Sequence, residues 1–110
     1  MNIIIFGTGQ YYKKYKSLAF EKSSVVALVD NNSAKQGAVI DGVPVIAPDK
    51  ISSKSYDYIV LLLAYIAAAE VKKQLLSLGV DERKSCSMTN MLQKFVEVKR
   101  LFIWQNLQKK

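Results

Sequence analysis

The residues best suited to chemistry lie at the ends of two short apolar runs. Gly7-Thr8-Gly9 follows the run 2–6, and Asp30 ends the run 25–29. Glycines at such a turn let a phosphate approach the backbone, and a carboxylate about 20 residues further on can accept hydrogen bonds from ribose hydroxyls. The spacing therefore predicts a nucleotide site in which Gly7 and Gly9 contact phosphate and Asp30 contacts ribose.

Four further residues complete the predicted site, because three of them adjoin these residues in the sequence and the fourth follows another expected strand. Thr8 and Gln10 flank Gly9, Asn31 follows Asp30, and Ala64 ends a third apolar run. The carboxyl ends of parallel strands meet at one edge of a sheet, and a helix that begins there offers free N–H groups and a positive dipole end to an anion. We expect the site at the carboxyl ends of the three central strands.

The glycine fingerprint is incomplete, and this leaves a second interpretation open. Tyr12 occupies the place of the third glycine of G-x-G-x-x-G, which normally lets helix and strand pack closely. Gly7 and Gly9 could instead only make a tight turn, and Asp30 could be a loop or cap residue. If Asp30 does hold a ribose, its charge repels a 2′-phosphate, which favours NAD or a UDP-type nucleotide over NADP.

Other reactive residues are interpreted as structural. Tyr12 and Lys16 have the Tyr-x-x-x-Lys spacing of short-chain dehydrogenases, but that pair belongs on a much later helix, so we treat the match as accidental. Lys13 and Lys14 are expected to be solvated, although they could reach a phosphate. Cys86 is expected in the core.

Composition excludes several classes of protein. The 110 residues include no histidine and one cysteine, which argues against zinc sites, histidine triads and an internal disulfide. No apolar run reaches the roughly 18 to 20 residues of a membrane span, and the N-terminal run lacks the basic start of a signal peptide. We therefore expect a cytoplasmic protein with no metal and no membrane span.

The net charge of +7 raises the possibility of nucleic-acid binding. The lysines are spread along expected helix faces, and only Arg83 and Arg100 are arginine. No recognition-helix or aromatic strand motif accompanies them. We therefore expect no nucleic-acid partner.

The order of elements predicts a three-layer α/β domain, Rossmann-like and doubly wound, with a mostly parallel sheet of four or five strands. Strands are expected at 2–6, 25–29 and 57–63, with a weak one at 84–88 and a hairpin over 39–46 around Asp41-Gly42, where Pro44 should mark an edge strand. Helices are expected from residue 9 or 10 to about 20, briefly from 48 to 52, and from 67 to 78. The last of these should bury Val71, Leu75 and Leu78, and end in a glycine cap at Gly79.

A closing helix is predicted from Met91 to about Gln108, which divides the chain into a domain at 1–89 and a C-terminal amphipathic helix at 90–110. Its residues are apolar on more than one side, with Phe102 and Trp104 among them. One sheet cannot cover all of this surface. We expect Met91–Leu107 to form a homodimer or to contact a partner domain, unless it simply packs on its own sheet.

Four segments together resemble a known module: Ile-Ile-Ile-Phe-Gly-Thr-Gly, Val-Val-Ala-Leu-Val-Asp-Asn-Asn, Ile-Asp-Gly-Val-Pro-Val-Ile and Leu-Gly-Val. The stretch Asn2–Met88 resembles the small Rossmann-like N-terminal domain of bacterial surface-polysaccharide enzymes, namely nucleotide-sugar dehydratases and epimerases and acyltransferases of the sialic-acid O-acetyltransferase type. Tyr12 departs from the small residue usual there.

This resemblance implies a nucleotide-sugar or dinucleotide site at Gly7, Gly9 and Asp30, with NAD or a UDP-sugar as ligand. It also implies that catalysis belongs to a separate C-terminal domain. We therefore expect a binding domain that performs no chemistry alone. The competing hypothesis is a degenerate Rossmann domain that binds a protein partner and no nucleotide.

Overall fold

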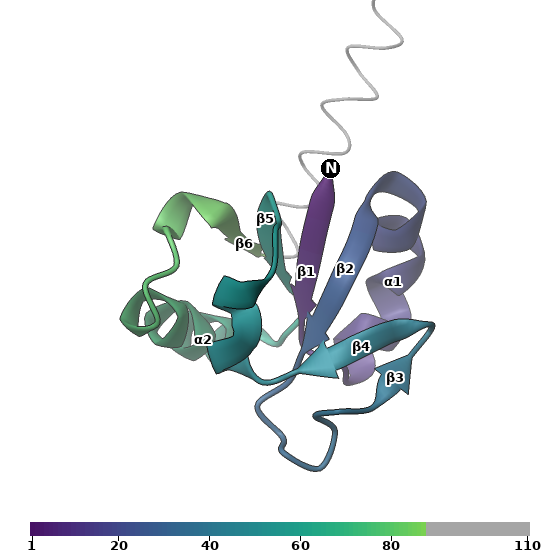
Figure 1. Cartoon of the computed structure of the whole chain (residues 1–110), viewed down its shortest axis with the longest axis horizontal. Coiled ribbons are helices and arrows are strands. Elements are labelled where there is room, and N and C mark those ends of the chain that lie inside the picture. The colour runs from purple at the N-terminus through teal and green to yellow at the C-terminus, as the bar shows by residue number, and fades with distance from the viewer. Residues whose placement is uncertain (88–110) are drawn as a thin grey trace, which may run out of the picture.

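The computed structural model describes residues 1–87, which form a sheet with helices on both faces (Figure 1). Within these residues the sheet has six strands in the order β3-β4-β2-β1-β5-β6. The strands are β1 Asn2–Phe6, β2 Ser24–Val29, β3 Val39–Ile40, β4 Val43–Ile46, β5 Tyr58–Leu61 and β6 Ser85–Ser87. The helices are α1 Gln10–Lys22 and α2 Tyr65–Ser77, with short 3-10 helices η1 Pro48–Ser53 and η2 Glu82–Lys84. The predicted doubly wound α/β class is confirmed, with one strand more than the upper estimate.

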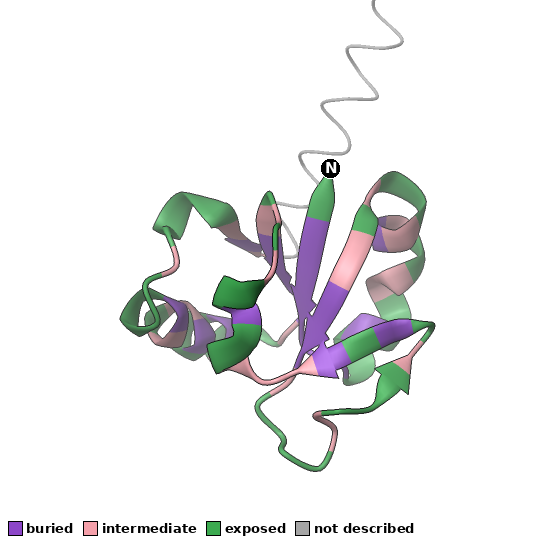
Figure 2. Ribbon diagram, viewed as in Figure 1, coloured by how far each residue is buried: buried purple, intermediate pink, exposed green. Residues whose placement is uncertain are grey.

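The central strand is β1, which pairs in parallel with β2 on one side and with β5 on the other. Helices cover both faces of the sheet around it (Figure 1). Ile3 to Phe6 are therefore all buried, at 2% exposure or less (Figure 2). This double coverage explains why the strand is a continuous apolar run rather than an alternating one.

Alternate residues of the central strands enter two separate cores. Ile3 and Ile5 point to the face that α1 covers, where Tyr12 packs against them. Ile4 and Phe6 point to the opposite face and pack with Val71 and other residues of α2 and η1. The two helices are thus fixed on opposite faces, and both begin at the edge where β1, β2 and β5 end.

The predicted hairpin is confirmed, but its edge assignment is wrong. Asp41 and Gly42 both have positive φ, +52° and +77°, as a type I′ turn requires. We expected Pro44 on an edge strand, yet β4 lies between β3 and β2. Pro44 is tolerated because the β2 ladder begins one residue later, at Val45, and the Val45 N–H donates to Ala38 on the β3 side.

Helix α2 begins earlier than expected, at Tyr65, and one of its predicted core residues is exposed. Val71 and Leu75 are buried, whereas Leu78 is 42% exposed. The helix ends in a Schellman motif, in which the Val80 N–H donates to Leu75 and the Gly79 N–H to Leu76. That motif turns Val80 onto the core in place of Leu78. The predicted glycine cap is therefore confirmed, and the burial of Leu78 is wrong.

Other boundaries differ by a few residues. Helix α1 runs two residues past the predicted end at 20, and β5 is shorter than the predicted 57–63. No helix among residues 1–87 is long and apolar enough to cross a bilayer. The predicted closing helix lies outside the described residues.

Candidate functional site

Gly7 is required by the fold of the turn after β1. Its φ is +113°, and a Cβ there would stand 2.6 Å from the carbonyl oxygen of Leu62 and 2.8 Å from Cδ2 of Leu63. The Gly7 N–H donates to the Val29 carbonyl at 2.8 Å, which continues the pairing of β1 with β2. The tight-turn interpretation therefore accounts for Gly7 without a ligand.

Gly9 differs, because nothing in the fold demands glycine there. Its φ is −91°, and a Cβ would meet no atom within 4 Å. Gly9 is the N-cap of α1, and it has no side-chain capping bond and no acidic residue in the first turn. The first N–H groups of α1 consequently lack a side-chain acceptor, and an anion could approach them closely.

Asp30 is held in place at the end of β2. Its Oδ2 accepts a 2.5 Å hydrogen bond from the hydroxyl of Thr8, and its Oδ1 accepts a 2.8 Å bond from the N–H of Asn32. The ammonium of Lys35 lies 3.9 Å from Oδ2. Thr8 is 5% exposed, so its side chain connects the glycine turn to β2 and leaves little surface for a ligand.

These contacts decide the charge of Asp30. Partial burial alone raises the pKa of its carboxyl, but the hydrogen bonds from Thr8 and Asn32 and the charge of Lys35 outweigh burial and lower the pKa. Asp30 is therefore an oriented carboxylate at neutral pH. Each of its oxygens still has capacity to accept a further hydrogen bond.

A cavity of about 370 Å³ joins the predicted residues to α2. It is lined by the turn Phe6 to Gly9, by three residues after β2, and by Leu63 with four residues along α2: Asp30, Asn31, Lys35, Leu63, Ala67, Glu70, Val71 and Gln74. Five predicted site residues thus meet at one cavity: Gly7, Thr8, Gly9, Asp30 and Asn31. Gln10, the first residue of α1, and Ala64, the N-cap of α2, are not among the residues that line it.

The contribution of α2 was not predicted from the sequence. Ala67, Glu70 and Gln74 face the cavity from successive turns of the helix. Gln74 exchanges two amide hydrogen bonds with Asn31, at 2.9 and 3.0 Å, which tie the loop after β2 to α2. The spacing of three and four residues places these side chains on one helix face, so periodicity could have found them.

Tyr12 has a structural role on the α1 face of the sheet. It is 1% exposed, and its hydroxyl donates a 2.6 Å hydrogen bond to Oδ2 of Asp41 in the hairpin. Lys16 forms an ion pair with the same oxygen at 3.0 Å. Burial, followed by the hydrogen bond to Asp41 and its charge, raises the pKa of Tyr12, which is opposite to what a catalytic tyrosine needs. The Tyr12/Lys16 pair therefore fixes the hairpin to α1.

Within residues 1–87 no three side chains of His, Cys, Asp or Glu come together as a metal site. Cys86 is buried in the core, as expected.

Comparison with protein families gives one match. The model of a family described as C2185-like, N-terminal, matches residues 1–86. A search of curated proteins found no match.

Several solved structures share the fold. UDP-D-quinovosamine 4-dehydrogenase from Vibrio fischeri superposes with a TM-score of 0.58 at 12% identity, over 84% of each chain. RSP, a Rex-family repressor, gives 0.57 at 19% identity, over 98% of this chain and 62% of that one. The same repressor with β-NAD⁺ and operator DNA gives 0.58 at 16% identity, over 99% and 61%. At these identities the likeness shows the Rossmann-like fold alone.

Proposed function

The chain belongs to the C2185-like, N-terminal, family, and we propose that its domain binds a nucleoside diphosphate ligand of the NAD or UDP-sugar type in the 370 Å³ cavity. One observation carries the proposal. The uncapped N-terminus of α1, open at Gly9, and the oriented carboxylate of Asp30 line the same cavity. A diphosphate lies against the first and the adjoining ribose against the second.

The charges around the cavity restrict the ligand. Asp30 and Glu70 both line it, and Lys35 is its single cationic lining residue. A ribose with free hydroxyls can donate to Asp30, whereas a 2′-phosphate would meet two carboxylates. The domain therefore prefers NAD or a UDP-sugar to NADP.

Structural neighbours support this ligand class. One is named as acting on a UDP-sugar, and RSP was solved with β-NADH, at a TM-score of 0.56 and 19% identity. The resemblance to polysaccharide enzymes extends the proposal to a cytoplasmic role in bacterial surface-sugar biosynthesis, without catalysis by this chain alone. Because RSP was also solved with operator DNA, the absence of a nucleic-acid partner remains an expectation.

The proposal is tested by calorimetric titration and thermal shift with NAD, NADP, UDP, UDP-glucose and coenzyme A. A ligand at 100 times its Kd stabilises the fold by about 2.7 kcal/mol. Asp30→Ala should weaken binding by about 1.5 to 3 kcal/mol, the scale of a hydrogen bond to a charged group. Asp49→Ala serves as the control. It removes an exposed carboxylate from η1, which does not line this cavity, and should leave the nucleotide affinity unchanged.

Two observations favour a second function. The Asn31–Gln74 bonds connect two walls of the cavity, and Asp30 already has protein partners. Both features stabilise the cavity without a ligand, as expected of a protein interaction module that has lost nucleotide binding. If none of the nucleotides produces heat or a shift, this second function replaces the first.

A further inference from the structure

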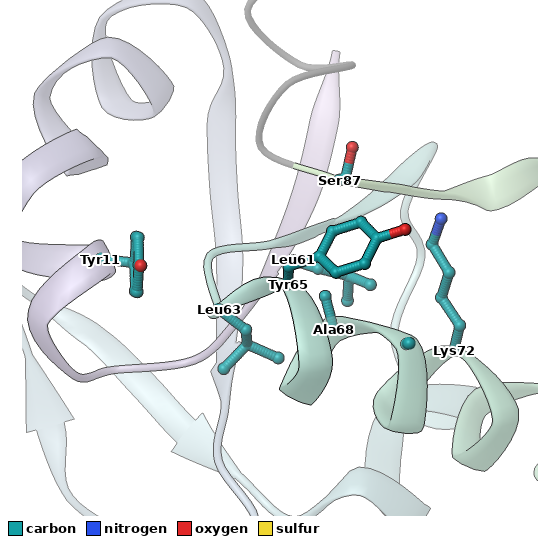
Figure 3. A pocket seen from close by; sticks show the side chains of 8 residues that line it. Tyr11, Leu61, Leu63, Tyr65, Ala68, Lys72 and Ser87 are labelled. Carbon is teal, nitrogen blue, oxygen red and sulfur yellow. The ribbon is translucent and has the colours of Figure 1, made fainter.

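A second cavity, of about 470 Å³, is shown in Figure 3 and shares one lining residue with the first. Its lining comes from the start of α1, the end of β5, α2 and β6: Tyr11, Leu61, Leu63, Tyr65, Ala68, Ala69, Lys72 and Ser87. Leu63 also lines the nucleotide cavity, so the two spaces adjoin at this residue. Both volumes fall within the roughly 300 to 1,000 Å³ of small-molecule sites.

Both cavities adjoin the start of α1, where the diphosphate is proposed to lie. Gly9, the N-cap of α1, lines the first cavity, and Tyr11, two residues later in the first turn, lines the second. A diphosphate held by the first N–H groups of α1 would therefore have the nucleoside on one side and its other substituent on the other. The second cavity is the space available for that substituent.

The walls of the second cavity combine aromatic rings with one amine. Tyr11 lies on one side and Tyr65, which is 90% exposed, lies on the other (Figure 3), and Leu61, Leu63 and Ala68 complete the apolar lining. Lys72 extends from α2 towards the side of Tyr65 and Ser87 (Figure 3). No acidic side chain is among the lining residues, and Lys72 forms no ion pair with any residue in the range 1–87.

We propose that this cavity receives the sugar of the nucleotide ligand and that this sugar carries a carboxylate. The ligand class is then a nucleoside diphosphate hexuronate, an inference that rests on the proposed nucleotide binding. The C–H face of a sugar packs against tyrosine rings, and the carboxylate pairs with the ammonium of Lys72 in a charge-assisted contact. The pyridinium ring of NAD⁺ would bring a second positive charge to Lys72 in the same space.

The test is calorimetric titration of the whole chain with UDP, UDP-glucose, UDP-glucuronate and NAD. The wild type should bind UDP-glucuronate about tenfold or more tightly than UDP-glucose, the scale of one hydrogen bond to a charged group. Lys72→Met should abolish this preference and leave the affinity for UDP unchanged, while Lys72→Arg should retain most of it. Lys73→Met removes the adjacent exposed lysine of α2 and should bind like the wild type.

Three results would overturn the inference while leaving the proposed function intact. They are equal affinity for the two UDP-sugars, a preference that survives Lys72→Met, and measurable binding of NAD without binding of UDP-glucuronate. If neither UDP nor NAD binds, the proposed function fails together with the inference. A fold check by circular dichroism on each variant separates lost binding from lost structure.

Discussion

Gly7 and Gly9 lie two residues apart in one turn and meet opposite requirements. Gly7→Ala should lower the free energy of unfolding by more than about 2 kcal/mol, because a positive φ costs a side chain about 1–2 kcal/mol and the new Cβ also collides with Leu62. Gly9→Ala should lower it by less, about 0.5 to 1 kcal/mol, since its Cβ meets nothing and the cost comes only from alanine being a poorer N-cap than glycine. Urea unfolding measures both.

For nucleotide binding we expect the opposite order, with Gly9 more sensitive to substitution than Gly7. Gly9→Val should remove nucleotide binding in a calorimetric titration, because its branched side chain covers the N–H groups of α1, and should cost less stability than Gly7→Ala. Equal losses of stability at the two glycines would show that both serve only the turn.

Tyr12 gives a prediction about alkaline pH. Its pKa is raised by burial and by Asp41, so the folded state keeps the proton that the unfolded chain loses near pH 10. Its contribution to stability is complete below about pH 10 and falls as the pH rises above that value. The stability advantage of the wild type over Tyr12→Phe should therefore shrink between pH 9 and 11 in urea unfolding. A difference that stays constant would contradict the raised pKa.

Contacts between single residues could be predicted from the sequence only where the two partners lie close together along the chain. The departure from the fingerprint at Tyr12 was evident from the sequence, but its partner Asp41 lies 29 residues away. Local spacing specifies which residues share a turn or a helix face. It does not specify which loop will cross that face, and the contact of Gln74 with Asn31, over 43 residues, was missed for the same reason.

Among the elements, the end of α2 offers the sharpest comparison. Leu75 is 1% exposed and Leu78 is 42% exposed. Leu75→Ala should cost about 2 to 5 kcal/mol, as truncation of a buried leucine does, whereas Leu78→Ala should cost less than about 1 kcal/mol. Chemical denaturation of the two variants measures this difference. Similar costs would mean that Leu78 does belong to the core.

The elements were predictable where one physical signal dominated. Continuous apolar runs marked β1 and β5 because helices bury both faces, and Asp41-Gly42 marked the hairpin because few residues accept two positive φ values in succession. The prediction is wrong at Pro44, where the lack of an N–H indicates an edge strand. In the structure Pro44 lies just before Val45, the first residue of β4 that pairs with β2, so the ladder does not require its N–H.

For the whole molecule, self-association is the open prediction. Met91–Leu107 has apolar residues on more than one side, with Phe102 and Trp104 as aromatic anchors. We predict a dimer that Phe102→Lys with Trp104→Lys converts to a monomer in sedimentation velocity, without loss of nucleotide binding. Lys109→Ala with Lys110→Ala, at the end of the chain, serves as the control. A wild-type monomer at every concentration would contradict the prediction.

The strand order also has a consequence for synthesis on the ribosome. Strand β1 emerges first and meets β2 within 30 residues, but its other neighbour, β5, ends only at Leu61. At roughly 5 to 20 residues per second, translation takes about 2 to 6 s to cover that interval. Throughout it the nascent chain carries β1, which is apolar from Ile3 to Phe6, with one side unpaired. Slow codons between β2 and β5 would prolong this state and favour aggregation on polysomes, whereas slow codons after β6 would not.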